Sequence, residues 1–139
     1  MPIIHPEDPI RLLASVPMVS VEPTMSLADL AAELDVQRVG AVAVMTGDHL
    51  DGVISERDIV RAIASQADPT DVWTADVMAD EPVSVDADDP IVTAAQRMLD
   101  EGVRHLPVMS EGRLVGVVSL RDVLPVFVDE WKRSPANRC

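Results

Sequence analysis

The chain has 139 residues and a formal net charge of −13, from 24 acidic against 11 basic residues. This charge disfavours contact with a phosphate backbone, and an aromatic content of 2% without tyrosine leaves no stacking platform for single-stranded nucleic acid. Apolar stretches such as residues 40–45 are too short to span a bilayer, and Met1–Pro9 lacks the pattern of a secretory signal. We therefore expect a cytoplasmic protein that binds neither nucleic acid nor a membrane.

The first half of the chain alternates helical and strand signals. A helix over Glu7–Ser15 precedes a short β-prone segment at Val19–Val21, and Ser26 can cap a helix that begins at Leu27. The turn signal Thr46-Gly47-Asp48 separates two β-rich runs, residues 41–45 and 50–54, and predicts a hairpin. A second helix is predicted from Ser55 to about Gln66.

The second half shows the same order of signals. Residues 67–81 are rich in Asp, Pro and Ala and are interpreted as a linker, with Trp73 and Met78 packed onto the core. A strand at residues 83–85 precedes a helix with Asp89 as N-cap and Pro90 as the first helical residue. We expect Arg97 on the solvated face of that helix. A hairpin of residues 106–109 and 114–118 leads into a helix from Ser119 to about Trp131, which Pro125 should kink or split.

The two halves are copies of one unit at an offset of 64 residues. Without a gap, 13 of the 42 aligned pairs that begin in residues 19–60 are identical. The longest match is Gly52-Val53-Ile54-Ser55-Glu56-Arg57-Asp58, which returns as Gly116-Val117-Val118-Ser119-Leu120-Arg121-Asp122. Since one unit of this size buries too little surface to be comfortably stable, the repeats should share a core. The sequence predicts an α+β fold of two tandem β-α-β-β-α repeats, divided into an N-terminal segment with a helix (1–16), a first repeat (17–66), a linker (67–81), a second repeat (82–131) and a tail (132–139).

The repeated Ser-x-x-Asp motif has two interpretations. It has the pattern of a capping box, which gives Ser55/Asp58 and Ser119/Asp122 a purely structural role. However, each box follows a strand directly, where backbone N–H groups at the helix start can receive an anion. Arg57 and Arg121 also lie in a first helical turn, where the helix dipole disfavours a cation unless an anion is bound.

A nucleotide would satisfy the second interpretation. A carboxylate beside a phosphate-binding helix start can accept the hydroxyl groups of a ribose, while arginine contacts phosphate. The adenine would need an apolar slot, for which the candidates are strand residues of both repeats: Ala41, Val42, Ala43, Leu106, Pro107 and Val108.

These residues resemble tandem cystathionine β-synthase (CBS) domains, the regulatory pair also called a Bateman module. The resemblance covers roughly residues 10–130 and rests on the two Gly-x-x-Ser-x-x-Asp motifs, on Asp76-Val77-Met78 and on residues 102–108, Gly-Val-Arg-His-Leu-Pro-Val. It implies two repeats packed through their sheets with pseudo-two-fold symmetry, a homodimer, and AMP, ADP, ATP, S-adenosylmethionine or NAD bound between the repeats, with or without magnesium. It also implies ribose contacts from Ser55, Asp58, Ser119 and Asp122, and a phosphate contact from Arg104 and His105.

The two sites should not be equivalent, because the first repeat has Gly40-Ala41 where the second has Arg104-His105. Ala79 also stands where the family usually has Thr or Ser. We expect no metal site from His5, His49 and His105, no disulfide from the single Cys139, and no catalytic nucleophile paired with a base. Two functions stay open: a sensor that reports an adenosine ligand to an unknown regulated protein, and a dimerisation module with degenerate sites.

Overall fold

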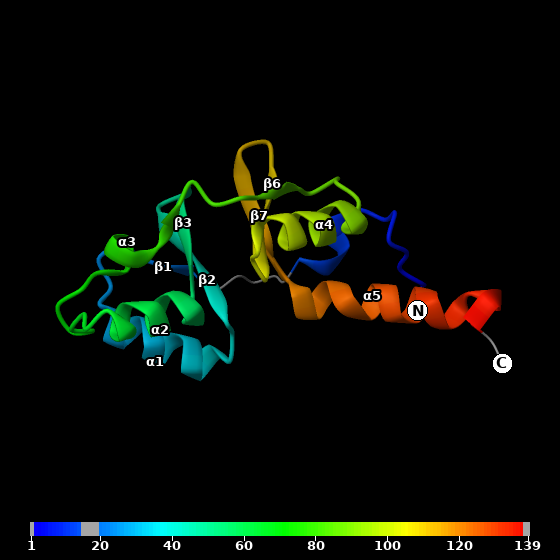
Figure 1. The fold of residues 1–139 in the computed structure, drawn as a ribbon. Coiled ribbons are helices and arrows are strands. Elements are labelled where there is room, and N and C mark those ends of the chain that lie inside the picture. Colours follow the sequence, from blue (N-terminus) through cyan, green and yellow to red (C-terminus); the bar gives the residue numbers. More distant parts are fainter. Residues whose placement is uncertain (1, 15–19, 138–139) are drawn as a thin grey trace. The chain divides into compact units, whose positions relative to one another are not determined.

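The computed structural model describes residues 2–14 and 20–137, which form two compact units (Figure 1). One unit contains residues 17–82, and the other combines residues 83–139 with the N-terminal residues 1–16. The N-terminal segment thus belongs with the second repeat, and residues 67–81, expected as a linker, belong with the first.

The unit of the first repeat has a four-stranded sheet in the order β1-β2-β3-β4. Strands β1 and β2 are parallel, whereas β3 runs antiparallel to both β2 and β4. The expected hairpin forms between β2 and β3 around the two residues Gly47 and Asp48. The elements of this unit are β1 (Ser20–Val21), α1 (Leu27–Gln37), β2 (Ala41–Thr46), β3 (His49–Ser55), α2 (Glu56–Ala64), α3 (Thr74–Val77) and β4 (Ala79–Asp80). Val19, part of the predicted first strand, lies outside the described residues.

The unit of the second repeat has a three-stranded sheet in the order β5-β6-β7. The β6–β7 hairpin turns through Glu111 and Gly112, whose φ angles of 50° and 77° match the left-handed conformation of a tight hairpin turn. Its elements are η1 (Ile10–Leu13), β5 (Val85–Asp86), α4 (Ile91–Glu101), β6 (His105–Ser110), β7 (Arg113–Ser119), α5 (Leu120–Arg133) and η2 (Pro135–Asn137).

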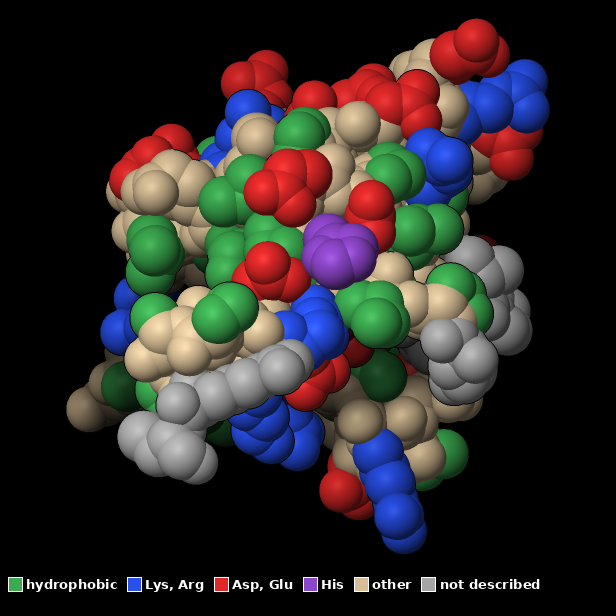
Figure 2. All heavy atoms as spheres, turned by 90° about the vertical axis from the view of Figure 1, so that its right-hand side faces the viewer, with side chains coloured by type: hydrophobic (Ala, Val, Ile, Leu, Met, Phe, Trp, Pro, Cys, Tyr) green, Lys and Arg blue, Asp and Glu red, His purple; other side chains and the backbone are tan. Residues whose placement is uncertain are grey.

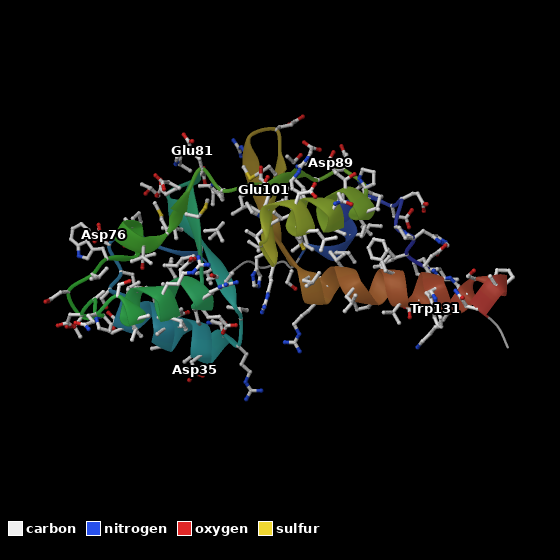
Figure 3. All side chains as sticks on the ribbon, viewed as in Figure 1. Asp35, Asp76, Glu81, Asp89, Glu101 and Trp131 are labelled. Carbon is white, nitrogen blue, oxygen red and sulfur yellow. The ribbon has the colours of Figure 1, made fainter. Side chains whose placement is uncertain are left out.

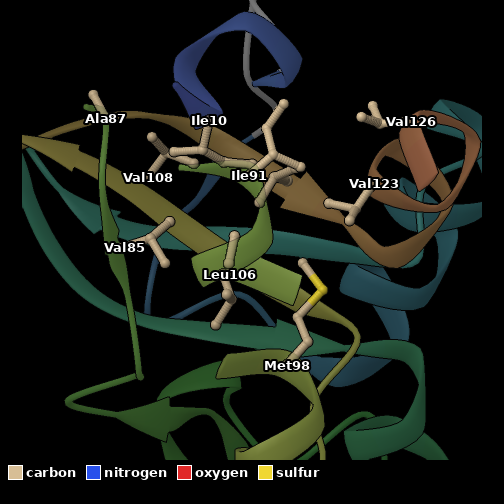
Figure 4. Close-up of a cluster of buried hydrophobic side chains, with 11 residues drawn as sticks. Ile10, Val85, Ala87, Ile91, Met98, Leu106, Val108, Val123 and Val126 are labelled. Atoms are coloured by element: carbon tan, nitrogen blue, oxygen red, sulfur yellow. The ribbon is translucent and has the colours of Figure 1, made fainter. Parts of the chain in front are cut away.

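Each unit has a core of its own, built from one face of its sheet and the inner faces of its helices. In the second-repeat unit, Leu106, Val108 and Val118 pack against residues of α4 and α5, as Figure 4 shows in part. Val42, Val44 and Ile54 have the same place in the first-repeat unit. Because side chains alternate along a strand, Ser55 and Ser119 lie on the opposite face of each sheet, away from the core.

The N-terminal segment completes the second repeat in the same way as residues 72–78 complete the first. The N–H groups of Ile10 and Arg11 donate to the carbonyls of Asp89 and Ala87. At the positions 64 residues away, Thr74 and Ala75 donate to Met25 and Pro23. Ile10 is fully buried in the second-repeat core. We call residues 2–14 the N-terminal strap.

Charged groups hold the outer part of the strap. His5 lies 3.2 Å from Glu130 of α5, and Arg11 lies 2.8 Å from Asp88. Hydrogen bonds from Arg133 and His5 hold the pKa of the Glu130 carboxyl below its usual value. These contacts are exposed, so we assign most of the attachment of the strap to the burial of Ile10.

The structure corrects five local expectations, and the first two concern predicted helices. The N-cap of α4 is Pro90 rather than Asp89, because the Asp89 carboxylate accepts the N–H of Asp86 instead. The helix expected over Glu7–Ser15 is a single 3-10 turn, and Ser15 lies outside the described residues.

The other corrections concern Pro125, Trp73 and Arg97. Of the two outcomes expected at Pro125, the split does not occur: α5 continues through it, since it removes only one backbone hydrogen bond early in a helix that is anchored by packing. Trp73 is 52% exposed instead of packed on the core, whereas Met78 does pack there. Arg97 is half-buried and donates to the carbonyl of Ser84, at the entry to β5.

Gly52 of β3 pairs with Asp80 of β4, and its missing side chain leaves room for the neighbouring residues. A Cβ atom there would lie 2.6 Å from the Ala79 carbonyl oxygen and 2.8 Å from the sulfur of Met78. We expect Gly52→Ala to weaken the β3–β4 pairing and to cost about 1–3 kcal/mol of stability, the usual range for overpacking. Denaturant unfolding measures this cost. Gly47→Ala has open space around its Cβ but a φ of 57°, so its cost reports left-handed backbone strain, whereas the cost of Gly52→Ala reports close approach.

Candidate functional site

The strand-to-helix junction of each unit is built by a complete capping box. In the second-repeat unit, Asp122 Oδ2 accepts the Ser119 N–H at 2.8 Å and the Ser119 hydroxyl at 2.9 Å, while Ser119 Oγ accepts the Asp122 N–H at 3.2 Å. The junction of Ser55 and Asp58 repeats these bonds at 2.8, 3.1 and 3.4 Å. The Ser-x-x-Asp motif therefore forms the predicted capping box in both repeats.

The capping box leaves specific groups available. Of the backbone donors at the start of α5, Ser119 N–H and Asp122 N–H are used by the box, and Leu120 N–H donates to the Arg104 carbonyl at 2.8 Å. Neither the Arg121 N–H nor Asp122 Oδ1 is hydrogen-bonded to any residue in the described part of the chain. One backbone donor and one carboxylate oxygen thus remain open at the junction.

The first-repeat junction has the same open groups. There, Glu56 N–H donates to the Gly40 carbonyl at 2.9 Å, which leaves the Arg57 N–H and Asp58 Oδ1 without a partner among the described residues. The sequence did not predict the hydrogen bonds from the helix starts to the carbonyls of Gly40 and Arg104, because a backbone hydrogen bond does not depend on residue type.

The second junction has more cationic and titratable residues than the first. The Arg104 carbonyl accepts the Leu120 N–H, which places Arg104 beside this junction. His105 is the cross-strand partner of Ser119, and Arg121 lies in the first turn of α5. Arg104 and Arg121 are exposed, and neither forms an ion pair with a described residue. The matching positions of the first repeat are Gly40, Ala41 and Arg57. The structure therefore places the backbone of three cationic or titratable residues beside the second junction and of one beside the first.

The candidate adenine-slot residues divide between the two faces of their sheets. Val42, Leu106 and Val108 belong to the hydrophobic cores of their units. Ala41 and Ala43 alternate with Val42 and thus share a face with Ser55. Pro107 is buried opposite Val117, on the face of Ser119. Of the candidates, Ala41, Ala43 and Pro107 lie on the same sheet face as the junction serines.

The chemistry available at the second junction is recognition of a polar, anionic ligand. Asp122 Oδ1 can accept a hydroxyl hydrogen, and the Arg121 N–H and the two guanidinium groups can donate to an anion. Over residues 2–14 and 20–137, no three His, Cys, Asp or Glu side chains are grouped as metal ligands. No helix in these residues combines the length and the apolar character that crossing a bilayer requires.

Comparisons with known proteins agree with this architecture. The model of the CBS domain family matches residues 10–65 and again residues 74–129. The chain is 30% identical over 112 residues to an uncharacterized protein of Methanopyrus kandleri, covering 78% of this chain but 57% of that protein. An uncharacterized 17.7 kDa protein of Acidianus ambivalens is 34% identical over 119 residues, 84% of this chain and 71% of that protein.

A solved structure is similar over nearly the whole chain. The CBS domain protein of Pyrobaculum aerophilum complexed with AMP matches with a TM-score of 0.80 and 31% identity, covering 87% of this chain and 96% of that one. Each family match contains one hairpin and the Ser-x-x-Asp junction that follows it, although residues 10–14 and 74–82 lie in the compact unit of the other repeat. The chain belongs to the CBS domain family and contains a tandem pair of CBS domains.

Proposed function

We propose that this chain is a regulatory module that binds an adenine nucleotide at the second-repeat junction and reports nucleotide level to a partner protein. The observation that carries the proposal is the pair of open groups beside the capping box, Asp122 Oδ1 and the Arg121 N–H, with Arg104 and His105 next to them. The AMP complex of the 31% identical Pyrobaculum protein supports an adenosine ligand. The role is binding and signalling, and we propose no catalytic step.

In this proposal Asp122 accepts the ribose hydroxyls, and Arg104, His105 and Arg121 contact phosphate. Ser119 keeps the carboxylate in place, because its hydroxyl already donates to Asp122. Ser55, Arg57 and Asp58 form a weaker second site that lacks the additional charges. The module acts as a homodimer, and AMP or ADP competes well against metal-free ATP because the net charge of −13 opposes a triphosphate.

Titration calorimetry on purified, nucleotide-stripped protein tests the proposal. Separate titrations with AMP, ADP, ATP with and without magnesium, S-adenosylmethionine and NAD should give saturable binding of an adenine nucleotide. Binding of S-adenosylmethionine or NAD alone would change the ligand class. If none of the ligands binds, the alternative holds: the capping boxes are only structural, and the chain is a dimerisation module.

Arg104→Ala should separate phosphate recognition from adenosine recognition. We expect AMP affinity to fall about 10-fold to 150-fold, the equivalent of about 1.5–3 kcal/mol for a hydrogen bond to a charged group, while adenosine affinity stays within about 2-fold. The Arg104 carbonyl contact to Leu120 persists because it belongs to the backbone. Equal losses for AMP and adenosine would show that Arg104 shapes the junction rather than binding phosphate. Arg113→Ala, an exposed arginine at the far end of the hairpin, is the charge control.

A further inference from the structure

The unit of the first repeat carries most of the negative charge of the chain. Residues 17–82 contain 13 acidic and three basic residues, a formal charge of −10, whereas the other unit has 11 acidic and eight basic residues, a formal charge of −3. On the face that Figure 2 shows, basic side chains lie among acidic ones. A ligand with a phosphate group is therefore repelled more strongly by the first-repeat unit, unless cations stand at the place where the ligand binds.

Two of the three basic residues of this unit lie at the end of the sheet where the first junction forms. Arg57 is in the first turn of α2, and Arg38 is the C-cap of α1. Figure 3 shows Asp35 in the last turn of α1, shortly before this cap. Gly40, two residues after the cap, accepts the Glu56 N–H of the first junction at 2.9 Å. At about 3.8 Å between consecutive Cα atoms, Arg38 lies within about 7.6 Å of Gly40, measured from Cα to Cα.

Arg38 and Arg57 are both available to an external anion. Both residues are exposed, and neither forms an ion pair with a residue in the described part of the chain. The many carboxylates of the unit thus leave the two guanidinium groups without a direct partner among the described residues. A guanidinium group can donate two parallel hydrogen bonds to a phosphate, which adds geometric fit to the attraction of opposite charges.

The backbone at Arg38 has a conformation that glycine adopts more easily. Its φ of 55° is left-handed, and at the position 64 residues later α4 ends with Gly102, whose φ is 66°. A side chain in this conformation is strained, whereas glycine is not. Arg38 also has a structural explanation, because a cation at a helix C-terminus complements the helix dipole, and lysine would do this equally well. An experiment on Arg38 has to separate phosphate binding from this structural role.

We propose that Arg38 is the phosphate-binding residue of the first-repeat site, where it takes the place that Arg104 has at the second. The inference rests on the proposed function and deepens it by naming the side chain that gives the weaker site its contact with an anion. That site remains the weaker one, because one arginine replaces Arg104 and His105 in a unit with the more negative charge.

Titration calorimetry in a chain with a disabled second site measures the effect of Arg38. Arg104→Ala with Asp122→Asn removes the proposed phosphate and ribose contacts of the second site, so that the remaining AMP binding reports the first. In this background, Arg38→Gly should lower AMP affinity about 10-fold or more and adenosine affinity less than about 2-fold. Arg38→Lys keeps the charge without the planar guanidinium group and should recover only part of the AMP affinity.

Two matched variants separate the ligand contact from the backbone and from the overall charge. Glu111→Gly is the backbone control, because Glu111 has a φ of 50° and its counterpart in the first repeat is Gly47, with a φ of 57°. Neither this change nor Arg38→Gly should lower the melting temperature, since relief of left-handed strain offsets the greater freedom of glycine in the unfolded chain. Arg61→Ala removes a positive charge from an exposed position on α2 and should change AMP affinity less than about 3-fold.

The outcomes distinguish this inference from the proposed function. If the wild-type chain binds no adenine nucleotide, the proposed function fails and the role of Arg38 fails with it. AMP binding to the wild type but not to the chain with the disabled second site would leave the proposed function intact and overturn the inference alone. Unchanged AMP affinity in Arg38→Gly, or equal losses for AMP and adenosine, would show that Arg38 serves only to end α1.

Discussion

Replacing Ile10 with Ala should lower the free energy of unfolding of the second-repeat unit by about 2–5 kcal/mol, the range for truncating a fully buried isoleucine. Ile10 is 0% exposed and belongs to the core with Ile91, Leu106 and Val123. The lost contacts join the N-terminal strap to the rest of its unit, which begins at residue 83, more than 70 residues after Ile10. We therefore expect the damage in β5, β6 and β7 rather than in the first repeat.

Hydrogen exchange resolved along the chain measures this effect. Amides of the β6–β7 hairpin should lose protection in Ile10→Ala, and those of the β2–β3 hairpin should keep theirs. Leu12→Ala is the matched control, since Leu12 lies in the same 3-10 turn but is 52% exposed, and its cost should stay within about 0.5 kcal/mol. If the two variants behave alike, the strap is not part of the second-repeat core.

The position of the N-terminal strap could not be predicted from the sequence, unlike the hairpins and the helices. Each hairpin and each helix after a junction serine follows from local signals, namely a turn dipeptide between β-rich runs and a cap before an apolar period. The pairing of Ile10 and Arg11 with Asp89 and Ala87 is long-range and has no such signal. The duplication extends to it, since positions 10 and 74 use the same bonds, but Ile10 and Thr74 share no residue type that would reveal it.

The candidate site was predictable to a similar extent. The sequence predicts Ser55, Asp58, Ser119 and Asp122 at two helix starts, and the structure forms the capping box at each. The sequence also predicts that the two junctions differ in charge, because the second repeat has Arg104-His105 where the first has Gly40-Ala41. The adenine slot was harder to predict. Val42 and Leu106 are apolar like the strand residues beside them, and only the sheet face on which each side chain lies shows that they belong to the cores. Arg97 was missed because the contact partner is a backbone carbonyl at Ser84.

Changing Asp122 to Asn should weaken nucleotide binding while preserving the capping box. The amide oxygen can still accept the Ser119 N–H, as Asp122 Oδ2 does at 2.8 Å, but the open carboxylate oxygen becomes an NH₂ donor. A ribose hydroxyl that donated to Asp122 would then face a second donor. We expect AMP affinity to fall about 10-fold to 150-fold, the equivalent of about 1.5–3 kcal/mol for hydrogen bonds to a charged group.

Two matched variants show whether the loss is specific to the second junction. Asp58→Asn makes the same change at the first repeat, which lacks the counterparts of Arg104 and His105, and should reduce AMP affinity less than 3-fold. Asp76→Asn removes one negative charge at a helix start where the Asp76 carboxylate accepts the Trp73 N–H at 3.1 Å, outside both junctions, and should leave AMP affinity unchanged. Since all three substitutions keep an acceptor for the cap, unequal calorimetric affinities would report ligand contacts rather than helix stability. Equal and small effects in all three would mean that the Ser-x-x-Asp motifs only begin helices.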